Sequence, residues 1–385
     1  MKIVYVVNEA SFFFSHRLRL AQEAKRRGAD VTLVCGANTG EYEATRHDLK
    51  VITLPLSRSG VNPLTEFRTF VHLLRLYRRL QPDLVHHVTI KPVVYGSLAA
   101  RLTRIAGVVN AVPGMGFVFT ARGFMAMLRR FFISNLYRLA LGHPNMRVIF
   151  QNREDLNLFV GSSIVRPEQS VMIRGSGVDL SEYDPVPEPS TESIVFVLIA
   201  RMLRDKGIGE FVDAARKVKL NYPNWDFWLV GDIDPGNPGS LKIEDLLAWD
   251  RAGIVHWLGH REDVPEILQL SHVLVLPSYY REGLPKTLLE AGAAEQAIIA
   301  SRVAGCLEFV TDGVTGLIVA PRDVEDLAAA MVRLGNDASL RRRLAQAARS
   351  KVEAIFRVED VVRDTFVVYQ QLLNQVTATP PAQPG

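Results

Sequence analysis

The stretch "VLVLPSYYREGLPKTLLEAGAAE", Val273 to Glu295, gives an apolar run, a polar turn and a helix-length segment in direct succession. The run "VLVL" has no polar position, which is the pattern of a strand buried on both faces of a parallel sheet. Pro285 is expected as the first helical residue, because its fixed φ suits the start of a helix. The succession predicts an α/β fold in which helices cover both faces of a sheet.

The same alternation of short apolar runs and helix-length segments continues along the whole chain. Strands are expected at 2–7, 31–35, 51–55, 84–89, 110–112, 148–150, 171–173, 194–200, 226–231, 254–259, 273–278, 297–301 and 316–320. Strands that alternate with helices form parallel sheets, and the pattern occurs twice. The sequence therefore predicts two Rossmann-like, doubly wound domains.

A proline-rich stretch marks the expected domain boundary. Residues 183–193, "YDPVPEPSTES", hold three prolines among acidic and small residues, which is typical of a linker. We expect a first domain at 1–182 and a second at 194–376, whose last helix is able to pack back on the first. The tail 377–385 is expected to be disordered. Ligands of such sheets bind beyond the carboxyl ends of the strands, so the active site is expected in a cleft between the domains.

The composition is that of a soluble globular enzyme, with 48% hydrophobic and 22% charged residues. Cys35 and Cys306 are the only cysteines, so a disulfide framework is excluded and a reducing compartment is favoured. We find no secretory signal, and no apolar run approaches the length of about 18 residues that indicates a membrane span. A cytoplasmic protein is therefore expected.

Charge is divided unevenly between the two halves. Residues 1–180 hold 24 Lys and Arg against 12 Asp and Glu, whereas residues 181–385 hold 21 against 29. From Leu84 to Arg153 there are nine basic residues and no acidic one. A basic half of this kind favours an anionic partner.

The segment 62–80 is expected to be a basic helix, with Asn62 as its N-cap and Pro63 as its first residue. One stripe of this helix carries Arg68, His72, Arg75 and Arg79. A solvated helix face is the alternative, but a second basic and apolar segment at 122–141 favours docking on an anionic membrane surface. No nucleic-acid partner is expected, because no reader motif is found.

Two glutamates flank the turn of the opening stretch, Glu282 in the loop and Glu290 in the second turn of the helix. Carboxylates accept hydrogen bonds from vicinal hydroxyls. The amides of Gly283 and Leu284, with Pro285 behind them, lie near a helix N-terminus that favours a phosphate. Hydroxyls and phosphate together describe a sugar nucleotide. On this stretch alone, the interpretation that both glutamates are solvated surface residues is equally favoured.

The segment "ARMLRDKG", Ala200 to Gly207, follows the first strand of the second domain. Its cations Arg201 and Lys206 suit a departing diphosphate, although solvated loop charges are the alternative. Asp232 and Asp234 form a D-x-D of the kind that binds Mn²⁺. Because Arg201 and Lys206 already balance the negative charge of the diphosphate, a structural role is favoured for these aspartates and no metal is expected.

These segments, with "WLVGD", "WLGHREDV" and "GCLEFVTDGVTGLIV", resemble the C-terminal domain of a family 4 glycosyltransferase. The resemblance implies the GT-B fold and retention of configuration at the anomeric carbon. It also implies that Glu282 contacts the donor sugar, that Glu290 contacts the ribose, and that Arg201 and Lys206 hold the diphosphate. Further along, His260 and Arg261 lie where the family holds the nucleobase.

The first half is similar to the branch of the family that extends polyprenyl-diphosphate-linked sugars, through "NEASFFFSHRLRLAQEAKRRGADVTLV", "HVTIKPVVYGSLAARL" and "VPGMGFVFT". The resemblance implies a UDP-sugar as co-substrate, a lipid-linked acceptor and a peripheral place on the inner face of the cell membrane. From their loops, His16, Arg17 and Lys91 are expected to meet the acceptor. Gly114 is expected to let the backbone approach the donor.

Two departures from the family pattern stand out. The loop "NEASFFFSHR" replaces a Gly-Gly pair that contacts the donor phosphate in many members. The segment "AAEQAII" stands where "AAG-x-P-V" is commoner, and Glu295 at the far end of the helix is expected to have little effect. The sequence thus predicts a retaining, sugar-nucleotide-dependent glycosyltransferase. The alternatives are a sugar-nucleotide epimerase of the same fold and a non-catalytic sugar-nucleotide-binding protein.

Overall fold

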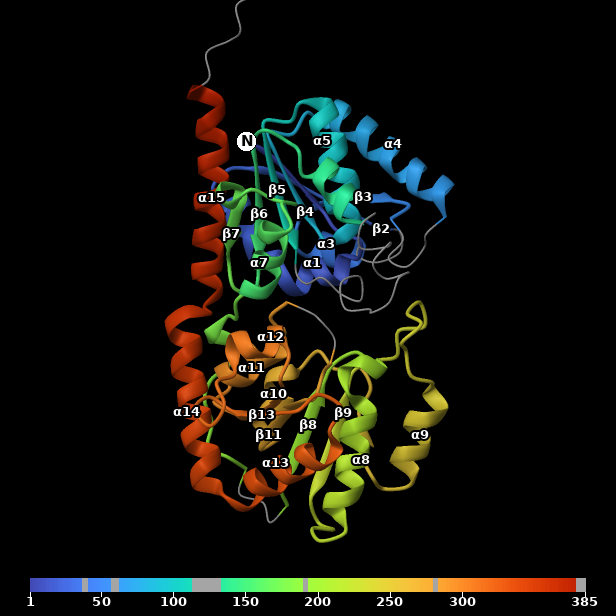
Figure 1. Ribbon diagram of the computed structural model, residues 1–385, viewed down its shortest axis with the longest axis vertical. Helices are drawn as coiled ribbons and strands as arrows, with labels where there is room; N and C mark the ends of the chain where they lie inside the picture. Colours follow the sequence, from blue (N-terminus) through green and yellow to red (C-terminus); the bar gives the residue numbers. More distant parts are fainter. Residues whose placement is uncertain (37–40, 57–61, 113–132, 190–192, 280–282, 379–385) are drawn as a thin grey trace, which may run out of the picture. The chain divides into compact units, whose positions relative to one another are not determined.

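The computed structural model describes residues 1–36, 41–56, 62–112, 133–189, 193–279 and 283–378, without the side chains of 41–43 and 375–378. The chain forms two compact units (Figure 1). Unit 1 comprises Met1–Ser176 together with Val358–Gly385, and unit 2 comprises Gly177–Arg357.

Unit 1 is built on a seven-stranded sheet with the order β3-β2-β1-β4-β5-β6-β7, in which every pairing is parallel. Its strands are β1 (Lys2–Val6), β2 (Asp30–Gly36), β3 (Lys50–Leu54), β4 (Leu84–Val88), β5 (Gly107–Val112), β6 (Met146–Phe150) and β7 (Ser170–Met172). β1 lies beside both β2 and β4, so the direction of winding reverses between β1 and β4. Such a reversal is where doubly wound sheets place their ligand sites.

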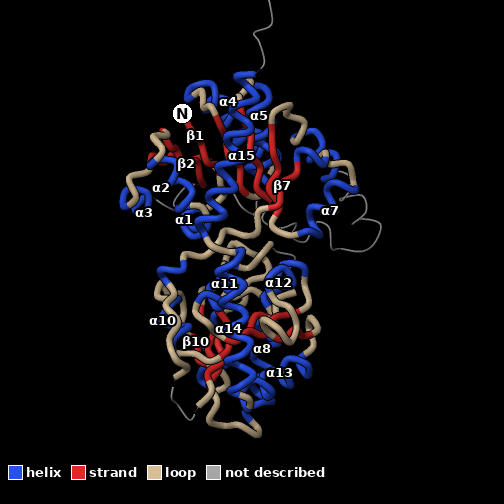
Figure 2. Tube along the Cα trace, turned by 90° about the vertical axis from the view of Figure 1, so that its left-hand side faces the viewer, coloured by secondary structure: helices blue, strands red, loops and turns tan. Residues whose placement is uncertain are grey.

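Helices cover both faces of this sheet. They are α1 (Ala10–His16), α2 (Leu18–Arg26), α3 (Glu41–Arg46), α4 (Pro63–Leu80), α5 (Ser97–Thr103), α7 (Arg153–Gly161) and α15 (Val358–Ala378), with a further helical stretch at 133–140. α1, α2 and α15 share one core, and α4, α5 and α7 share the core on the opposite face. Figure 2 shows α15 lying over the strands of the first of these faces.

Unit 2 repeats the design with a six-stranded parallel sheet of the order β10-β9-β8-β11-β12-β13. Its strands are β8 (Val195–Ile199), β9 (Asp226–Val230), β10 (His256–Trp257), β11 (Val273–Leu276), β12 (Ala297–Ser301) and β13 (Leu317–Val319). β8 and β11 are all buried, and alternate residues of each enter cores on opposite faces. The winding reverses between β8 and β11.

The helices of unit 2 are α8 (Ile208–Lys219), α9 (Ile243–Arg251), α10 (Val264–Gln269), α11 (Lys286–Ala293), α12 (Ala304–Phe309), α13 (Val324–Asn336) and α14 (Ala338–Ile355). α8, α9 and α13 pack on one face, and α10, α11 and α12 on the other. α14 contributes side chains to both cores.

Each expected strand is present, within a few residues at its ends. The expected start of α4 is confirmed, because the Asn62 side chain accepts a hydrogen bond from the Leu64 amide at 3.0 Å. Pro285 is a correction: its ψ of 127° is extended, so it is the N-cap of α11 and Lys286 is the first helical residue. The part of the 122–141 helix that lies within the described residues is helical from 133 to 140.

The division between the units differs from the expected domain boundaries. The stretch expected as a linker belongs to unit 2, because Tyr183 is buried there and Glu188 pairs with Arg341 at 2.8 Å. α15 belongs to unit 1, where the Tyr369 hydroxyl lies 2.6 Å from Nδ1 of His86 in β4. α15 also takes in residues 377 and 378, and 379–385 lie outside the described residues.

Candidate functional site

In unit 2, the loops that follow β8 and β11 leave the sheet side by side, at the point where its winding reverses. The backbone holds them together. The Asp205 carbonyl accepts hydrogen bonds from the Tyr279 amide at 3.0 Å and from the Ser278 hydroxyl at 3.1 Å. Gly207 has φ of 77°, and a Cβ there would lie 2.3 Å from the Pro277 carbonyl oxygen, so only glycine fits. The loop that carries Arg201 and Lys206 is therefore hydrogen-bonded to the loop that follows β11. The two motifs singled out in the sequence lie next to each other.

Arg201 leaves the end of β8 and is half exposed, with 46% of its side chain accessible. Its Nη1 lies 2.6 Å from Oδ2 of Asp234, in the loop after β9. The loops after β8 and β9 meet closely, because a Cβ on Gly231 would fall 1.9 Å from the Ala200 carbonyl oxygen. Asp234 thus orients the guanidinium and leaves part of it open to solvent.

This pairing gives the D-x-D segment a structural contact. Asp234 binds Arg201, and the Asp232 carbonyl accepts a hydrogen bond from the Met202 amide at 2.9 Å. Among the described residues, no group of three or more His, Cys, Asp and Glu side chains is arranged to hold a metal ion. Lys206 ends the 3₁₀ turn Arg204–Lys206 in the same loop, with its side chain partly exposed.

Glu290 lies in α11 and is buried, with 7% of its side chain accessible. Its Oε1 is 2.8 Å from Nζ of Lys286, one helical turn earlier. The hydroxyl of Tyr183 also lies against this carboxylate. Burial, and then the carboxylate, raise the pKa of the tyrosine. Sequence reasoning missed Lys286 and Tyr183, although the i, i+4 spacing of Lys286 and Glu290 was a signal for the ion pair.

The turn before α11 is only partly described. Gly283, Leu284 and Pro285 are buried in it. Glu282 and Gly114, two of the residues predicted to contact the donor, lie outside the described residues.

His260 and Arg261 follow β10 and are exposed. The Trp257 indole donates to the Gly231 carbonyl at 2.9 Å, which ties this loop to the one after β9. Arg261 forms a two-pronged ion pair with Asp263, with Nε 2.7 Å from Oδ1. That pair holds the pKa of the Asp263 carboxyl well below its usual range. Both residues therefore lie on a loop connected to the one that carries Asp234.

In unit 1 the residues predicted for the acceptor lie in three different surroundings. Arg17 is buried, with 5% of its surface accessible, close to Tyr5 and Tyr369. Burial lowers the pKa of this guanidinium, and its Nε has no hydrogen-bond partner among the described residues. His16 is half-buried and stacks on the Phe12 ring at 4.1 Å.

Lys91, after β4, forms an ion pair with Glu66 of α4, with its Nζ 2.5 Å from Oε1. Each of these two side chains is only 15% accessible. Burial, and then the Glu66 carboxylate, raise the pKa of the nearby Tyr95 to about 12. Among the residues predicted to bind the acceptor substrate, Lys91 is thus one that pairs with a carboxylate. A phosphate group of the substrate would have to replace that carboxylate.

The outer face of α4 carries the predicted basic stripe. Arg68, Arg75 and Arg79 are all exposed, as is His72. Near the amino end of the helix, Leu64 and Phe67 are 71% and 64% accessible. The exposed face is therefore basic along its length and apolar at one end, a combination that the sequence had not indicated.

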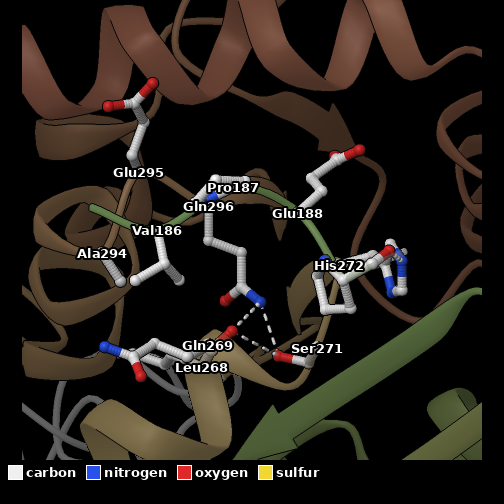
Figure 3. A pocket seen from close by; sticks show the side chains of 11 residues that line it. Val186, Pro187, Glu188, Leu268, Gln269, Ser271, His272, Ala294, Glu295 and Gln296 are labelled. Atoms are coloured by element: carbon white, nitrogen blue, oxygen red, sulfur yellow. Dashed lines mark hydrogen bonds between the residues drawn. The ribbon is translucent and has the colours of Figure 1, made fainter. Parts of the chain in front are cut away.

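A pocket lies at the opposite edge of the unit 2 sheet, where the strands begin (Figure 3). His272 and Gln296 stand directly before β11 and β12, and Gln296 donates to the Leu268 carbonyl at 3.1 Å and to the Ser271 hydroxyl at 2.5 Å. His272 accepts from the Val195 amide at 3.1 Å. These polar groups join the segments before three strands, on the side away from the predicted donor residues.

Two family models match the chain, one on each half. The model described as "Glycosyl transferase 4-like" matches residues 2–152, and the model described as "Glycosyl transferases group 1" matches residues 181–351. The chain belongs to the glycosyltransferases. The second match contains both the Arg201 loop and α11, so the predicted donor residues that the structure describes all lie within it.

Two curated glycosyltransferases match nearly the whole chain. The N,N'-diacetylbacillosaminyl-diphospho-undecaprenol alpha-1,3-N-acetylgalactosaminyltransferase of Campylobacter jejuni is 29% identical over 391 aligned residues, covering 98% of this chain and 100% of the relative. The UDP-Gal:alpha-D-GlcNAc-diphosphoundecaprenol alpha-1,3-galactosyltransferase of Escherichia coli is 24% identical, covering 88% and 89%.

Solved structures agree on the fold. A glycosyltransferase from Rickettsia africae superposes with a TM-score of 0.78 at 18% identity, covering 97% of this chain and 98% of that one. WaaG, a glycosyltransferase involved in lipopolysaccharide biosynthesis, has a TM-score of 0.71 at 16% identity, covering 98% and 100%. This glycosyltransferase therefore has the GT-B fold that the resemblance implied.

Proposed function

We propose that this glycosyltransferase moves a hexose or N-acetylhexosamine from a UDP-sugar to a polyprenyl-diphosphate-linked sugar, with retention of configuration, in the assembly of a surface glycan. The observation that carries the proposal is the joined pair of loops in unit 2, which ties the Arg201–Lys206 segment to the loop that follows β11. The names of the two relatives support the substrate classes, because both act on diphosphoundecaprenol-linked sugars.

The chemistry follows from the charges at this edge of the sheet. The bond between the anomeric carbon and the phosphate oxygen breaks while the acceptor hydroxyl oxygen forms a bond to that carbon. The acceptor proton passes to the departing phosphate oxygen on the same face. Negative charge grows on the diphosphate, and Arg201 and Lys206 stabilise it. Glu290 holds the ribose and Glu282 the donor sugar, so the protein contributes positioning as well as charge.

Two further donor contacts complete the proposal. His260 and Arg261 border the nucleobase from the loop after β10, and the amides of Gly283 and Leu284 face a phosphate near the start of α11. On the acceptor side, Lys91 exchanges its Glu66 partner for a phosphate of the lipid-linked substrate. His16 and Arg17 follow β1, the strand beside β4, and we keep them as candidates for the acceptor.

The diphosphate charge is met by side chains, so the proposed reaction needs no divalent metal. Activity is expected to survive EDTA at millimolar concentration. A complete loss of activity that Mn²⁺ restores would instead make Asp232 and Asp234 metal ligands and would remove Asp234 from its pairing with Arg201.

The enzyme is proposed to work on the inner face of the cell membrane, where its lipid-linked acceptor lies. Among the described helices, none is both long and apolar enough to cross a bilayer. The exposed face of α4 supports peripheral docking: its arginines suit anionic head groups, and Leu64 and Phe67 suit the acyl boundary.

The test is a transfer assay with a panel of UDP-sugars and a short polyprenyl-diphosphate-linked sugar, read by mass spectrometry. The proposal predicts an acceptor that gains the mass of one hexose or N-acetylhexosamine. A donor converted to its epimer without an acceptor product would show a sugar-nucleotide epimerase. A donor bound but unchanged would show a non-catalytic binding protein.

A further inference from the structure

Glu290 lies where burial of a carboxylate is energetically unfavourable. It is almost fully buried in α11, and a buried carboxylate loses hydration that other donors must replace. Lys286 supplies one donor at 2.8 Å from Oε1. Lys286 is itself 28% accessible, so the ion pair lies at the boundary between solvent and core.

Tyr183 supplies a second donor from a distant part of the chain. It follows the 3₁₀ turn Leu180–Glu182, before the first strand of unit 2, and only 3% of its surface is accessible. Burial raises the pKa of its hydroxyl, and the neighbouring Glu290 carboxylate raises it further. A tyrosine that keeps its proton is a hydrogen-bond donor, and an ionised carboxylate is an acceptor.

Arg349 of α14 fixes the tyrosine relative to α11. Its Nη1 donates to the Tyr183 carbonyl at 2.8 Å and also to the Ala293 carbonyl, at the end of α11. Its Nε pairs with Glu353 at 2.7 Å, which limits the movement of the guanidinium. The backbone of Tyr183 is thereby tied to the same helix that carries Glu290.

We infer that Tyr183 and Lys286 are positioning residues that orient the Glu290 carboxylate toward the two hydroxyls of the donor ribose. An ionised carboxylate has about four acceptor sites, so two protein donors leave room for a diol. The inference rests on the proposed function, since it takes the donor to be a UDP-sugar bound through Glu290. Both residues contact Glu290, the proposed ribose ligand, so the effect is expected on nucleotide binding rather than on the chemical step.

The test compares UDP with 2′,3′-dideoxy-UDP, which lacks the diol, by titration calorimetry on the full chain. Tyr183→Phe removes only the hydroxyl. A hydrogen bond to a charged group gives about a tenfold or larger change in affinity, so the Kd for UDP is expected to rise about tenfold or more. The Kd for the dideoxy nucleotide is expected to stay within about twofold of the wild-type value, because the lost hydroxyl acts through the ribose contact.

Kinetics and a matched variant separate positioning from structure. In Tyr183→Phe, KM for the donor should rise about as much as Kd, while kcat at saturating donor changes less than about threefold. Tyr222→Phe is the control, because it removes another hydroxyl of unit 2, which accepts from Asn336 at 2.8 Å. The control should bind both nucleotides as the wild type does. If Tyr183→Phe melts early, Lys286→Met gives the same comparison.

The outcomes distinguish this inference from the proposed function. Equal weakening of both nucleotides in Tyr183→Phe and in Lys286→Met, or no weakening in either, would overturn the positioning role. Glu290→Ala is run beside them. If Glu290→Ala binds UDP as the wild type does, the donor site itself is misassigned. If it weakens UDP while the other two variants do not, the donor site stands and only the positioning role fails.

Discussion

The two units carry sheets of the same kind, yet the residues predicted from them behave differently. In unit 2, Arg201, Lys206 and Glu290 lie on loops and a helix that the backbone joins at one edge of the sheet. In unit 1, Arg17 is buried against Tyr5 and Tyr369, and Lys91 is held by Glu66. The first group was chosen from motifs, the second from nearness to a strand end.

The difference shows what each kind of reasoning can give. A motif fixes the spacing between its residues, and this spacing determines the direction in which each side chain leaves a loop or a helix. A place after a strand sets only where the backbone lies. Arg17 follows β1 at the junction of α1 and α2, but its side chain turns toward the core instead of the edge.

The ion-paired cations of the two units differ in how exposed they are. Arg201 is paired with Asp234 and still has 46% of its side chain accessible, whereas Lys91 and Glu66 are each 15% accessible. A diphosphate can approach Arg201 without breaking its pair. At Lys91 a phosphate has to compete with a shielded carboxylate, so we expect the weaker energetic contribution there.

The largest expected effect is at the cations of unit 2. Arg201→Ala and Lys206→Ala should each lower kcat by about 10²-fold or more, because each removes a charge aimed at the departing diphosphate. Arg204→Ala is the matched control, since Arg204 is an exposed cation in the same loop. Steady-state kinetics with saturating donor checks this. Turnover near the wild-type level in both variants would contradict the assignment of Arg201 and Lys206 to the diphosphate.

The next effect divides the two glutamates. Glu290→Ala should weaken free UDP by about tenfold or more, because a charged acceptor for the ribose is lost. Glu282→Ala should bind free UDP normally and transfer sugar poorly. Calorimetry with UDP, paired with the transfer assay, measures both. Equal loss of UDP affinity in the two variants would mean that the division of roles is wrong.

A smaller effect is expected at the surface of α4. Replacing Arg68, Arg75 and Arg79 with glutamate should weaken binding to anionic vesicles by about tenfold at physiological salt, since each arginine near such a surface contributes about 1 kcal/mol before screening. Co-sedimentation across a salt series measures it, with zwitterionic vesicles and the unit 2 variant Arg216→Glu/Lys217→Glu as controls. Hydrolysis of donor in solution should be unchanged. Equal binding of the variant and the wild type to anionic vesicles would leave the stripe as ordinary surface.

The smallest effect concerns stability alone. Glu295 has φ of 55°, and its amide and that of Gln296 close the end of α11 on the Gly292 and Ala291 carbonyls. A left-handed residue with a Cβ costs about 1 kcal/mol, so Glu295→Gly should raise the free energy of unfolding by about that much. Urea denaturation measures it. Glu295→Ala is the control, because alanine keeps the Cβ and should show no comparable gain.

The sequence predicted the features that depend on local patterns and missed those that depend on contacts between distant parts of the chain. The strands and the Arg201 and Glu290 segments were predictable because apolar runs and motif spacing are local. The start of α11 was placed one residue early, because Pro285 favours a helix start without deciding between N-cap and first residue. Asp234 and Tyr183 were not predicted as partners, since each contact joins residues far apart in the chain.

We propose that the nucleotide binds the edge of unit 2 where the strands end, while the acceptor binds unit 1. Hydrogen–deuterium exchange on the full chain tests it most directly, with UDP and, separately, with the lipid-linked acceptor. We predict that UDP protects amides in the loops after β8, β9 and β10 and at the start of α11, and that the acceptor protects the region after β4. Protection by UDP in unit 1, or around the pocket at His272 and Gln296, would contradict it.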